Sequence, residues 1–281
     1  MDVSDCISTL IDRIGLRAGT FYAGRLCGTH AFHEDEGVGH LHVVRHRSLT
    51  VTHPDLAPLH IEKPTLLFYP RPLQHRLEVP EWAAADIVCA SVRYDVGMEN
   101  AMTRSFPAVL AVPIDAAPAL ESTLTLLFAE AAVNRVGRQV MLDRLCDVLL
   151  LQIVRYAVEH ELVVGGTLGG LAHPRLGGLV AEILDAPERS WTLETMAHRA
   201  HLSRSAFARL FKAVLGVAPI DFLTKLRIAN AQQLLRKGRP LAVVASAVGY
   251  GSQPALSRAF IREVGAAPSE WLRAIEGQAA S

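Results

Sequence analysis

Residues 202–219 read LSRSAFARLFKAVLGVAP, and the chain repeats this pattern at residues 256–268 as LSRAFIREVGAAP. The residues that recur, with an offset of 49, are Arg209, Phe211, Gly216 and Pro219, matched by Arg258, Phe260, Gly265 and Pro268. A glycine followed by a proline is typical of the end of a helix. The preceding segments, residues 192–203 and 241–252, are related by a similar offset. The sequence therefore predicts two copies of one unit, in which two short helices are joined by a turn.

The second helix of each unit is predicted to be amphipathic. The apolar positions, which we expect to be buried, are Phe207, Leu210, Phe211 and Val214 in the first copy and Leu256, Ala259, Phe260 and Val264 in the second. The opposite faces carry Arg204, Ser205, Ala208, Arg209 and Lys212 in the first copy and Ser252, Gln253, Pro254 and Arg258 in the second. Arginine pairs with guanine and glutamine with adenine, while serine and lysine hold phosphate. Two such faces in register favour DNA contact over ordinary solvated helix surfaces.

Residues 220–237, between the two units, read as one helix. Eighteen residues span about 27 Å at ~1.5 Å each. A rod of that length can hold two helices near the ~34 Å repeat of successive major grooves. The duplication is therefore explained if one chain contacts two adjacent turns of DNA.

The two halves of the chain differ in charge although the total is zero. Residues 1–164 carry a net charge of −6 and residues 165–281 carry +6. This asymmetry predicts that the second half meets a polyanion. We place the domain boundary between residues 164 and 165, within the glycine-rich segment 163–174, which we interpret as a linker.

The first half changes to short β-like runs between Gly39 and Val92, which predict an antiparallel jelly-roll barrel. Residues 118–133 and 137–161 follow as two helices. The second helix is apolar around most of its circumference, which is compatible with a dimer contact or with burial inside one monomer. The predicted class is α+β, with a β-barrel and its helical extension followed by an all-α domain that contains two helix-turn-helix units.

Residues 175–275 closely resemble the DNA-binding domain of AraC-family transcriptional regulators, down to the closing glycine, proline and tryptophan at Gly265, Pro268 and Trp271. The first half resembles a cupin-type sensor and dimerisation domain, through LHVVRHRSL and FYPRPLQH. The resemblance implies a DNA-binding regulator, usually a homodimeric activator that works with RNA polymerase at a promoter operator. Two residues depart from the pattern, because His201 replaces a turn glycine and Pro254 a polar residue. No nucleophile-elbow or phosphate-loop motif occurs, and we expect no enzyme activity.

Histidines cluster in the predicted barrel. Side chains alternate between the two faces of a strand, so His40 and His42 are predicted to lie on the same face, and His46 is expected to share that face. Together with His75 they resemble the metal-ligand motifs of cupins, in which His46 replaces a glutamate. The implied cofactor is a divalent ion such as zinc, nickel, copper or iron, and a degenerate barrel without metal is the alternative.

Four widely spaced cysteines favour reduced thiols in a cytoplasm. Together with the stretches HPRLGGLVAEIL, LTKLRIANAQQ and SAVGYGS, their placement resembles the redox-sensing branch of AraC regulators that respond to reactive chlorine or other oxidants. This resemblance implies oxidation at Cys27 and Cys89. A jelly roll can bring these two cysteines side by side, whereas Cys146 is expected to be an inert buried thiol. The alternative trigger is an organic effector in a pocket lined by Phe68, Tyr69 and Trp82, although the sequence is equally compatible with these three residues in the core. The N-terminal residues lack the pattern of a signal peptide, and we expect no membrane span.

Overall fold

The structure, a computed structural model, describes residues 15–33, 38–46, 48–80, 82–94 and 105–279 of the 281 residues. The described chain divides into two compact units. The first comprises residues 15–94 and 105–164 within the described ranges, and the second begins at Gly165. In the described part of the chain, no helix is long and apolar enough to span a lipid bilayer.

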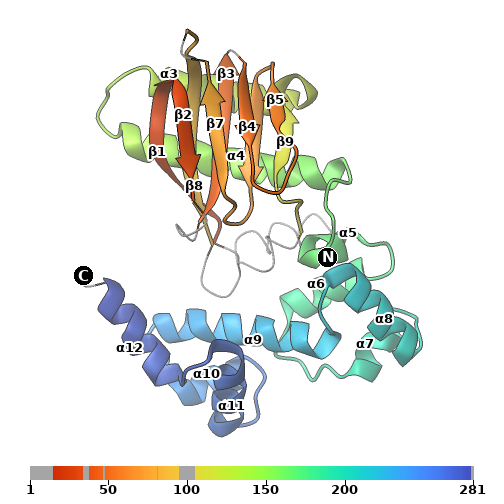
Figure 1. The fold of residues 1–281 in the computed structure, drawn as a ribbon. Coiled ribbons are helices and arrows are strands. Elements are labelled where there is room, and N and C mark those ends of the chain that lie inside the picture. Colours follow the sequence, from red (N-terminus) through yellow and green to blue (C-terminus); the bar gives the residue numbers. More distant parts are fainter. Residues whose placement is uncertain (1–14, 34–37, 47, 81, 95–104, 280–281) are drawn as a thin grey trace. The chain divides into compact units, whose positions relative to one another are not determined.

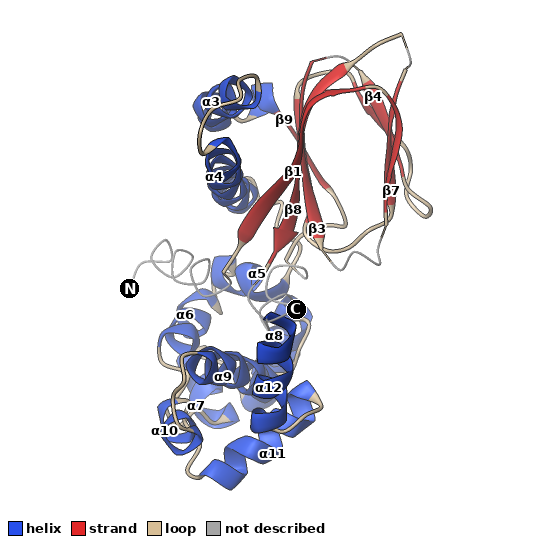
Figure 2. Cartoon of the chain, turned by 90° about the vertical axis from the view of Figure 1, so that its left-hand side faces the viewer, coloured by secondary structure: helices blue, strands red, loops and turns tan. Residues whose placement is uncertain are grey.

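Two antiparallel sheets form the barrel of the first unit. The strands are β1 (Arg17–Leu26), β2 (Gly28–Phe32), β3 (Gly39–His46), β4 (Leu49–Thr52), β5 (Leu59–Ile61), β6 (Thr65–Tyr69), β7 (His75–Val79), β8 (Ala85–Arg93) and β9 (Leu110–Pro113). One sheet has the order β1-β8-β3-β6-β9 and the other β2-β7-β4-β5. Figure 2 shows the two sheets face to face, with α3 (Glu121–Ala131) and α4 (Arg138–Glu159) on the outer side of the larger sheet. The α+β class is confirmed, while β1, β2 and β9 were not expected.

The burial of each strand follows from what covers its two faces. All five residues of β6 are buried, because the barrel interior lies on one side of the larger sheet and the helices on the other. In the smaller sheet, β7 alternates between buried and more exposed residues, as expected when one face is solvated. The barrel core consists of apolar side chains from both sheets, among them Val51, Leu67, Leu77 and Ile87.

Helix α4 also satisfies the free edge of β1. The backbone N–H groups of Ala18 and Thr20 donate to the carboxylates of Asp147 and Asp143, each at 2.7 Å. The Gln139 side chain donates to the Thr20 carbonyl at 2.6 Å. These bonds replace the strand neighbour that β1 lacks on this side, because β1 lies at the edge of its sheet.

The described part of the second unit contains only helices and the segments that join them. They are α5 (Gly166–Ala172), α6 (Gly177–Asp185), α7 (Leu193–Arg199), α8 (Arg204–Leu215), α9 (Pro219–Arg236), α10 (Leu241–Ala247), α11 (Gln253–Val264) and α12 (Pro268–Ala279). Figure 1 shows α9 running between two groups, with α7 and α8 towards one end and α10, α11 and α12 towards the other. The pairs α7–α8 and α10–α11 are the two predicted helix-turn-helix units, and α9 is the predicted connecting helix.

The interpretation of residues 163–174 as a linker is wrong. Most of this segment is α5, and its Leu168 and Leu171 are buried. Its glycines serve close packing, because a Cβ atom on Gly170 would lie 2.9 Å from the Leu215 side chain of α8. The glycine at this position therefore allows α5 and α8 to pack closely and does not indicate a flexible chain.

Each helix-turn-helix unit has its own aromatic contact with the next helix. Phe211 of α8 packs on Phe222 of α9 with ring centroids 5.6 Å apart. Phe260 of α11 packs on Trp271 of α12 at 5.5 Å. Both contacts are edge-to-face, which aromatic pairs prefer over a face-to-face sandwich. The sequence repeat therefore encodes a repeated packing motif.

We expect His201→Gly to stabilise the first helix-turn-helix unit. His201 has φ +53°, a left-handed conformation, and the matching residue of the second unit is Gly249 with φ +83°. Glycine adopts this conformation without the Cβ penalty, so the expected gain is about 0.5–1 kcal/mol in the free energy of unfolding. Thermal unfolding of the full chain measures the change.

The matched control is Ala200→Gly. Ala200 precedes His201 with an ordinary φ of −81°. A glycine there only adds freedom to the unfolded chain and removes a buried methyl group, so it should lower stability. A loss of stability in His201→Gly as well would show that the turn is not strained.

Candidate functional site

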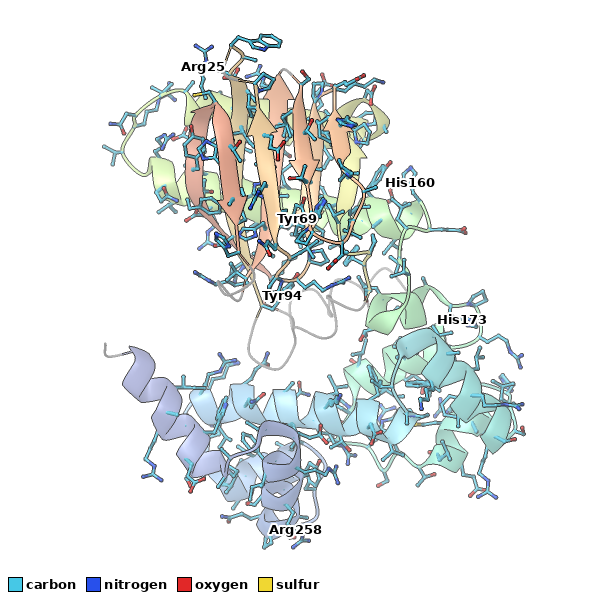
Figure 3. All side chains as sticks on the ribbon, in the orientation of Figure 1. Arg25, Tyr69, Tyr94, His160, His173 and Arg258 are labelled. Carbon is cyan, nitrogen blue, oxygen red and sulfur yellow. The ribbon has the colours of Figure 1, made fainter. Side chains whose placement is uncertain are left out.

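The outward faces of α8 and α11 carry most of the residues predicted to contact DNA. Figure 3 shows the labelled Arg258 projecting from α11 away from the neighbouring helices. The exposed members of the set are Arg204, Ser205, Arg209, Lys212, Ser252, Gln253, Pro254 and Arg258, and Ala208 is half-buried. The opposite faces are buried at Phe207, Phe211, Leu256, Ala259 and Phe260, as predicted, while Leu210, Val214 and Val264 are only half-buried.

Serine caps hold the start of each outward-facing helix. The Ser203 hydroxyl accepts from the Ala206 N–H at 3.3 Å, and the Ser252 hydroxyl accepts from the Ala255 N–H at 3.4 Å. Pro254 lies in the first turn of α11, where no backbone donor is needed. Ser252 and Pro254 therefore contribute to helix geometry, which leaves Arg258 and Gln253 as the long polar side chains at this end.

Cys27 lies at the point where the chain changes sheets. It follows β1 of the larger sheet and precedes β2 of the smaller one. The next residue, Gly28, has φ +76°, a conformation that glycine tolerates best. The Cys27 side chain is an exposed free thiol. A dissolved oxidant can therefore reach it without opening the barrel.

Cys89 and Cys146 are buried free thiols. Burial, with the Cys146 thiol nearby, raises the pKa of Cys89 far above its usual range. Burial likewise raises the pKa of Cys146 to about 12, although the Thr20 hydroxyl donates to its sulfur at 3.7 Å. Since the thiolate is the reactive form, both are unreactive as they stand, and the expectation for Cys146 is confirmed.

Cys27 and Cys89 do not lie side by side. Tyr22 pairs with Cys89 across β1 and β8, and Leu26 pairs with Ala85. Cys27 follows Leu26, so it is displaced from Cys89 by about five residues along the strand, or on the order of 16 Å. A disulfide requires Cα atoms roughly 4.4–6.8 Å apart. The expected juxtaposition is wrong for this conformation, because the register of β1 separates the two thiols.

A buried histidine and aromatic cluster occupies the barrel interior next to Cys89. Cys89 pairs with His42 across β8 and β3. His40, His42 and His75 are fully buried. The His75 ring is stacked between Phe32 and Tyr69, at centroid distances of 4.8 Å and 4.0 Å, and Figure 3 labels Tyr69 at this end of the sheets. Phe32 and His53 also belong to this cluster but were not predicted from the sequence. The imidazole Nε2 of His53 lies 3.0 Å from the Tyr69 hydroxyl.

Hydrogen bonds determine the protonation of His42 and His75. The Leu73 carbonyl can only accept, so His75 Nδ1 donates to it at 2.7 Å. Burial lowers the pKa of His75 to about 3 and that of His42 well below its usual range, so both rings are neutral. His75 Nε2 must then accept from His42 Nε2, 2.8 Å away. His42 Nδ1 is left with no hydrogen-bond partner among the described residues.

The predicted metal ligands do not form a metal site as they lie. Among the described side chains, no three His, Cys, Asp or Glu residues are placed to hold a metal ion. His75 uses Nδ1 on the Leu73 carbonyl and Nε2 on His42, so both nitrogens of this ring are engaged in hydrogen bonds. A β-bulge between Val44 and His46 pairs His46 with Asp86, out of phase with His42 and Cys89. The pairing of His46 thus departs from the regular register that His40 and His42 follow, and its side chain lies outside the described part of the structure.

The expected aromatic pocket is also absent from this arrangement. Trp82 is 83% exposed and does not line the barrel interior. Tyr69 belongs to the barrel core, and Phe68 is buried in an edge-to-face contact with Phe106 at 5.5 Å. Phe68 and Tyr69 are accordingly core residues.

Comparisons with known proteins agree with both halves of the fold. Residues 5–159 match the cupin family model, and residues 196–274 match a helix-turn-helix domain model. The chain is 29% identical to the RCS-specific HTH-type transcriptional activator RclR of Escherichia coli (strain K12), over 84% of this chain and 86% of that protein. It is 35% identical to a putative AraC-like transcription regulator of Streptomyces antibioticus, over 59% and 56% of the two chains. The DNA-binding domain of AdpA, solved with a target DNA, is 32% identical over 38% of this chain and 96% of that one, with a TM-score of 0.36.

A barrel followed by two helix-turn-helix units defines this protein as a DNA-binding transcriptional regulator and not as an enzyme. The chain belongs to the cupin family over residues 5–159, and its helix-turn-helix domain makes it a regulator of the AraC family.

Proposed function

We propose that this regulator binds a double-stranded operator through the outward faces of α8 and α11, and that oxidation of Cys27 and Cys89 controls this binding. In the DNA contact, Arg209, Gln253 and Arg258 read base edges, while Arg204, Ser205, Lys212 and Ser252 hold phosphates. Ala208 and Pro254 line the same faces without polar groups. The exposure of these side chains opposite two buried aromatic faces supports this assignment.

The connecting helix supports the reading of two grooves by one chain. α9 has 18 residues, which correspond to about 27 Å. It packs against α8 of the first unit and against α10, α11 and α12 of the second. A single helix therefore joins the two recognition helices, and its length can hold them near the ~34 Å groove repeat.

The observation that carries the redox proposal is the contrast between Cys27, just beyond the end of β1, and Cys89, midway along the paired strand β8. Cys27 is exposed beyond the end of β1, and Cys89 is buried on β8, where it pairs with Tyr22 of β1. The relative from Escherichia coli is named as a reactive-chlorine-specific activator, and its likeness to this chain spans both domains. Strand β1 ends next to the accessible thiol and pairs with the strand that carries the protected thiol, and this arrangement is suited to a redox switch.

The proposed chemistry proceeds in two steps. A two-electron oxidant such as hypochlorous acid first converts the Cys27 thiolate to a sulfenic acid. The Cys89 thiol then loses its proton as its sulfur attacks the Cys27 sulfur, the S–O bond breaks to give a disulfide, and the released hydroxide takes up that proton to form water. Because of the separation of about 16 Å, the second step requires the end of β1 to leave β8.

A displacement of β1 is transmitted to α4 by the hydrogen bonds that join the strand edge to this helix. Asp143, Asp147 and Gln139 of α4 bind the β1 backbone. The opposite face of α4 exposes Met141, Val148 and Leu151 at helical spacing. We propose that this apolar stripe forms the homodimer contact and that β1 alters it. Operator binding, recruitment of RNA polymerase and activation then follow in the cytoplasm, where the operator DNA is present.

Removing both carboxylates, in Asp143→Ala/Asp147→Ala, should free the edge of β1. Each hydrogen bond to a charged acceptor contributes roughly 1.5–3 kcal/mol. Because the sites are partly exposed, we expect the free energy that protects the β1 amides from hydrogen exchange to fall by about 2–4 kcal/mol in total. Amide hydrogen exchange of the β1 peptide should therefore accelerate roughly 30- to 1000-fold. The Asp143→Asn/Asp147→Asn variant keeps the acceptor oxygens and should lose less than half of this protection. Unchanged exchange in the alanine variant would exclude α4 as a restraint on β1.

Disulfide mapping by mass spectrometry tests the redox proposal directly. Purified full-length protein is mapped before and after a brief, substoichiometric pulse of hypochlorous acid, and its affinity for operator DNA is measured on the same samples. We expect a Cys27–Cys89 peptide to appear together with a change in affinity. Thiols that stay reduced while the affinity changes, or a disulfide without any change in affinity, would refute control by these cysteines.

A further inference from the structure

Besides α9, a second junction joins the turn of the second helix-turn-helix unit to the loop that leads into the first unit. Residues 187–189 follow α6 and precede α7 of the first unit, whereas Gly249 and Tyr250 form the turn between α10 and α11 of the second. The backbone of Glu188 lies against Gly249, since a Cβ atom added to this glycine would be 2.5 Å from the Glu188 carbonyl oxygen. Two turns that are far apart in the sequence are therefore in direct contact within the second domain.

Arg227 of α9 holds both sides of this junction. Its Nε donates to the Pro187 carbonyl and its Nη2 to the Arg189 carbonyl, each at 2.8 Å. The guanidinium also lies over the Tyr250 ring, 5.6 Å from the centroid. A planar guanidinium with fixed donors suits two carbonyls and a ring face at once, which a lysine ammonium does not.

The loop that Arg227 binds is itself restrained. The Trp191 indole N–H donates to the Ala186 carbonyl at 2.9 Å, which closes the segment into a compact turn. On the other side, Val244, Ala245 and Val248 of α10 and its end belong to the same buried cluster as Ile228 of α9. Arg227 therefore connects the restrained loop at residues 187–189 with the packed core of α9 and α10, and its bonds limit the relative rotation of these two parts.

We propose that Arg227 is a positioning residue that sets the distance and rotational phase between α8 and α11, and thereby the spacing between the two base motifs that one chain reads. This inference rests on the proposal that both helices contact DNA. One base pair changes the separation of two sites by about 3.4 Å and their phase by about 35°. A junction that restrains rotation can therefore discriminate between spacings that differ by a single base pair.

The test selects binding sites from a randomised DNA duplex library with full-length protein. The variants are Arg227→Met, which keeps the length of the side chain, and Arg227→Lys, which keeps the charge and carries the test if the methionine variant does not fold. Lys225→Met is the matched control, because Lys225 is an exposed cation two residues away on the same helix. Gly249→Ala perturbs the junction from the other side.

We expect the wild type and Lys225→Met to enrich two base motifs at one spacing. Arg227→Met, Arg227→Lys and Gly249→Ala should enrich the same two motifs with spacings spread over at least one additional base pair. A general loss of stability lowers the enrichment of every site alike and leaves the spacing distribution unchanged.

Two results would overturn the inference, and they are distinguishable. If the Arg227 variants retain the single spacing of the wild type, Arg227 does not position the units although both units read DNA. If the wild type itself enriches only one motif, the reading of two grooves by one chain fails, and the role of Arg227 fails with it.

Discussion

Arg258→Ala should abolish specific DNA binding at physiological salt. Arg258 is exposed on α11, and the neighbouring Pro254 offers no hydrogen-bond donor. In the first unit, Ala208 occupies the corresponding surface without a polar group. Few side chains remain to read bases, so one arginine pair with guanine carries much of the discrimination. One such pair contributes roughly 5- to 150-fold, so its loss should weaken binding to a selected site by at least that factor and bring it down to the level of random DNA.

The control for this experiment separates base reading from charge. Arg273→Ala removes the same charge from α12, where Arg273 is exposed outside both helix-turn-helix units. Lys212→Ala should instead weaken selected and random duplexes alike and lower the salt dependence by about one phosphate contact. Both affinities are measured by fluorescence anisotropy on duplexes selected by the wild type. Full affinity and unchanged discrimination in Arg258→Ala would remove Arg258 from the recognition surface.

Cys27→Ser and Cys89→Ser should each abolish the response to oxidant, whereas Cys146→Ser should keep it. Serine preserves the size of the side chain and cannot be oxidised in this way. The exposed Cys27 must react first, because burial keeps Cys89 protonated. In Cys89→Ser the reaction should stop at the Cys27 sulfenic acid. In Cys27→Ser the buried Cys89 should remain a thiol.

Two readouts check these variants. A reporter behind a selected operator gives the ratio of promoter activity with and without hypochlorous acid, which should fall to about one in both Cys27→Ser and Cys89→Ser. Dimedone, which labels sulfenic acids, should label Cys27 in the Cys89→Ser protein. Cys146→Ser is the matched control, because Cys146 is an equally buried thiol close to Cys89. Intact oxidant-dependent activation in both serine variants would place the switch elsewhere.

The DNA-facing helices were predictable because their signals are local. The buried stripe at Phe207 and Phe211 follows from a spacing of four residues, and the Ser203 cap acts within a single turn. The duplication gave a second indication of DNA contact, because the outward faces of two unrelated helices rarely carry similar residues in register. The apolar residues Met141, Val148 and Leu151 could likewise be recognised from their local helical spacing, although this spacing does not show which surface covers them.

The sequence by itself determined the α+β class, the two helix-turn-helix units, the connecting helix and the barrel strands β3 to β8. Each of these depends on residues within one helical turn or one alternating strand. Only the tertiary structure decided how far Cys27 lies from Cys89, which way His42 and His75 share a proton, and what Arg227 holds. These depend on strand register, on a bulge beside His46 and on loops that are remote in sequence. A single slip of register moves a side chain to the other face of a sheet, and nothing within one strand specifies the register of its partner.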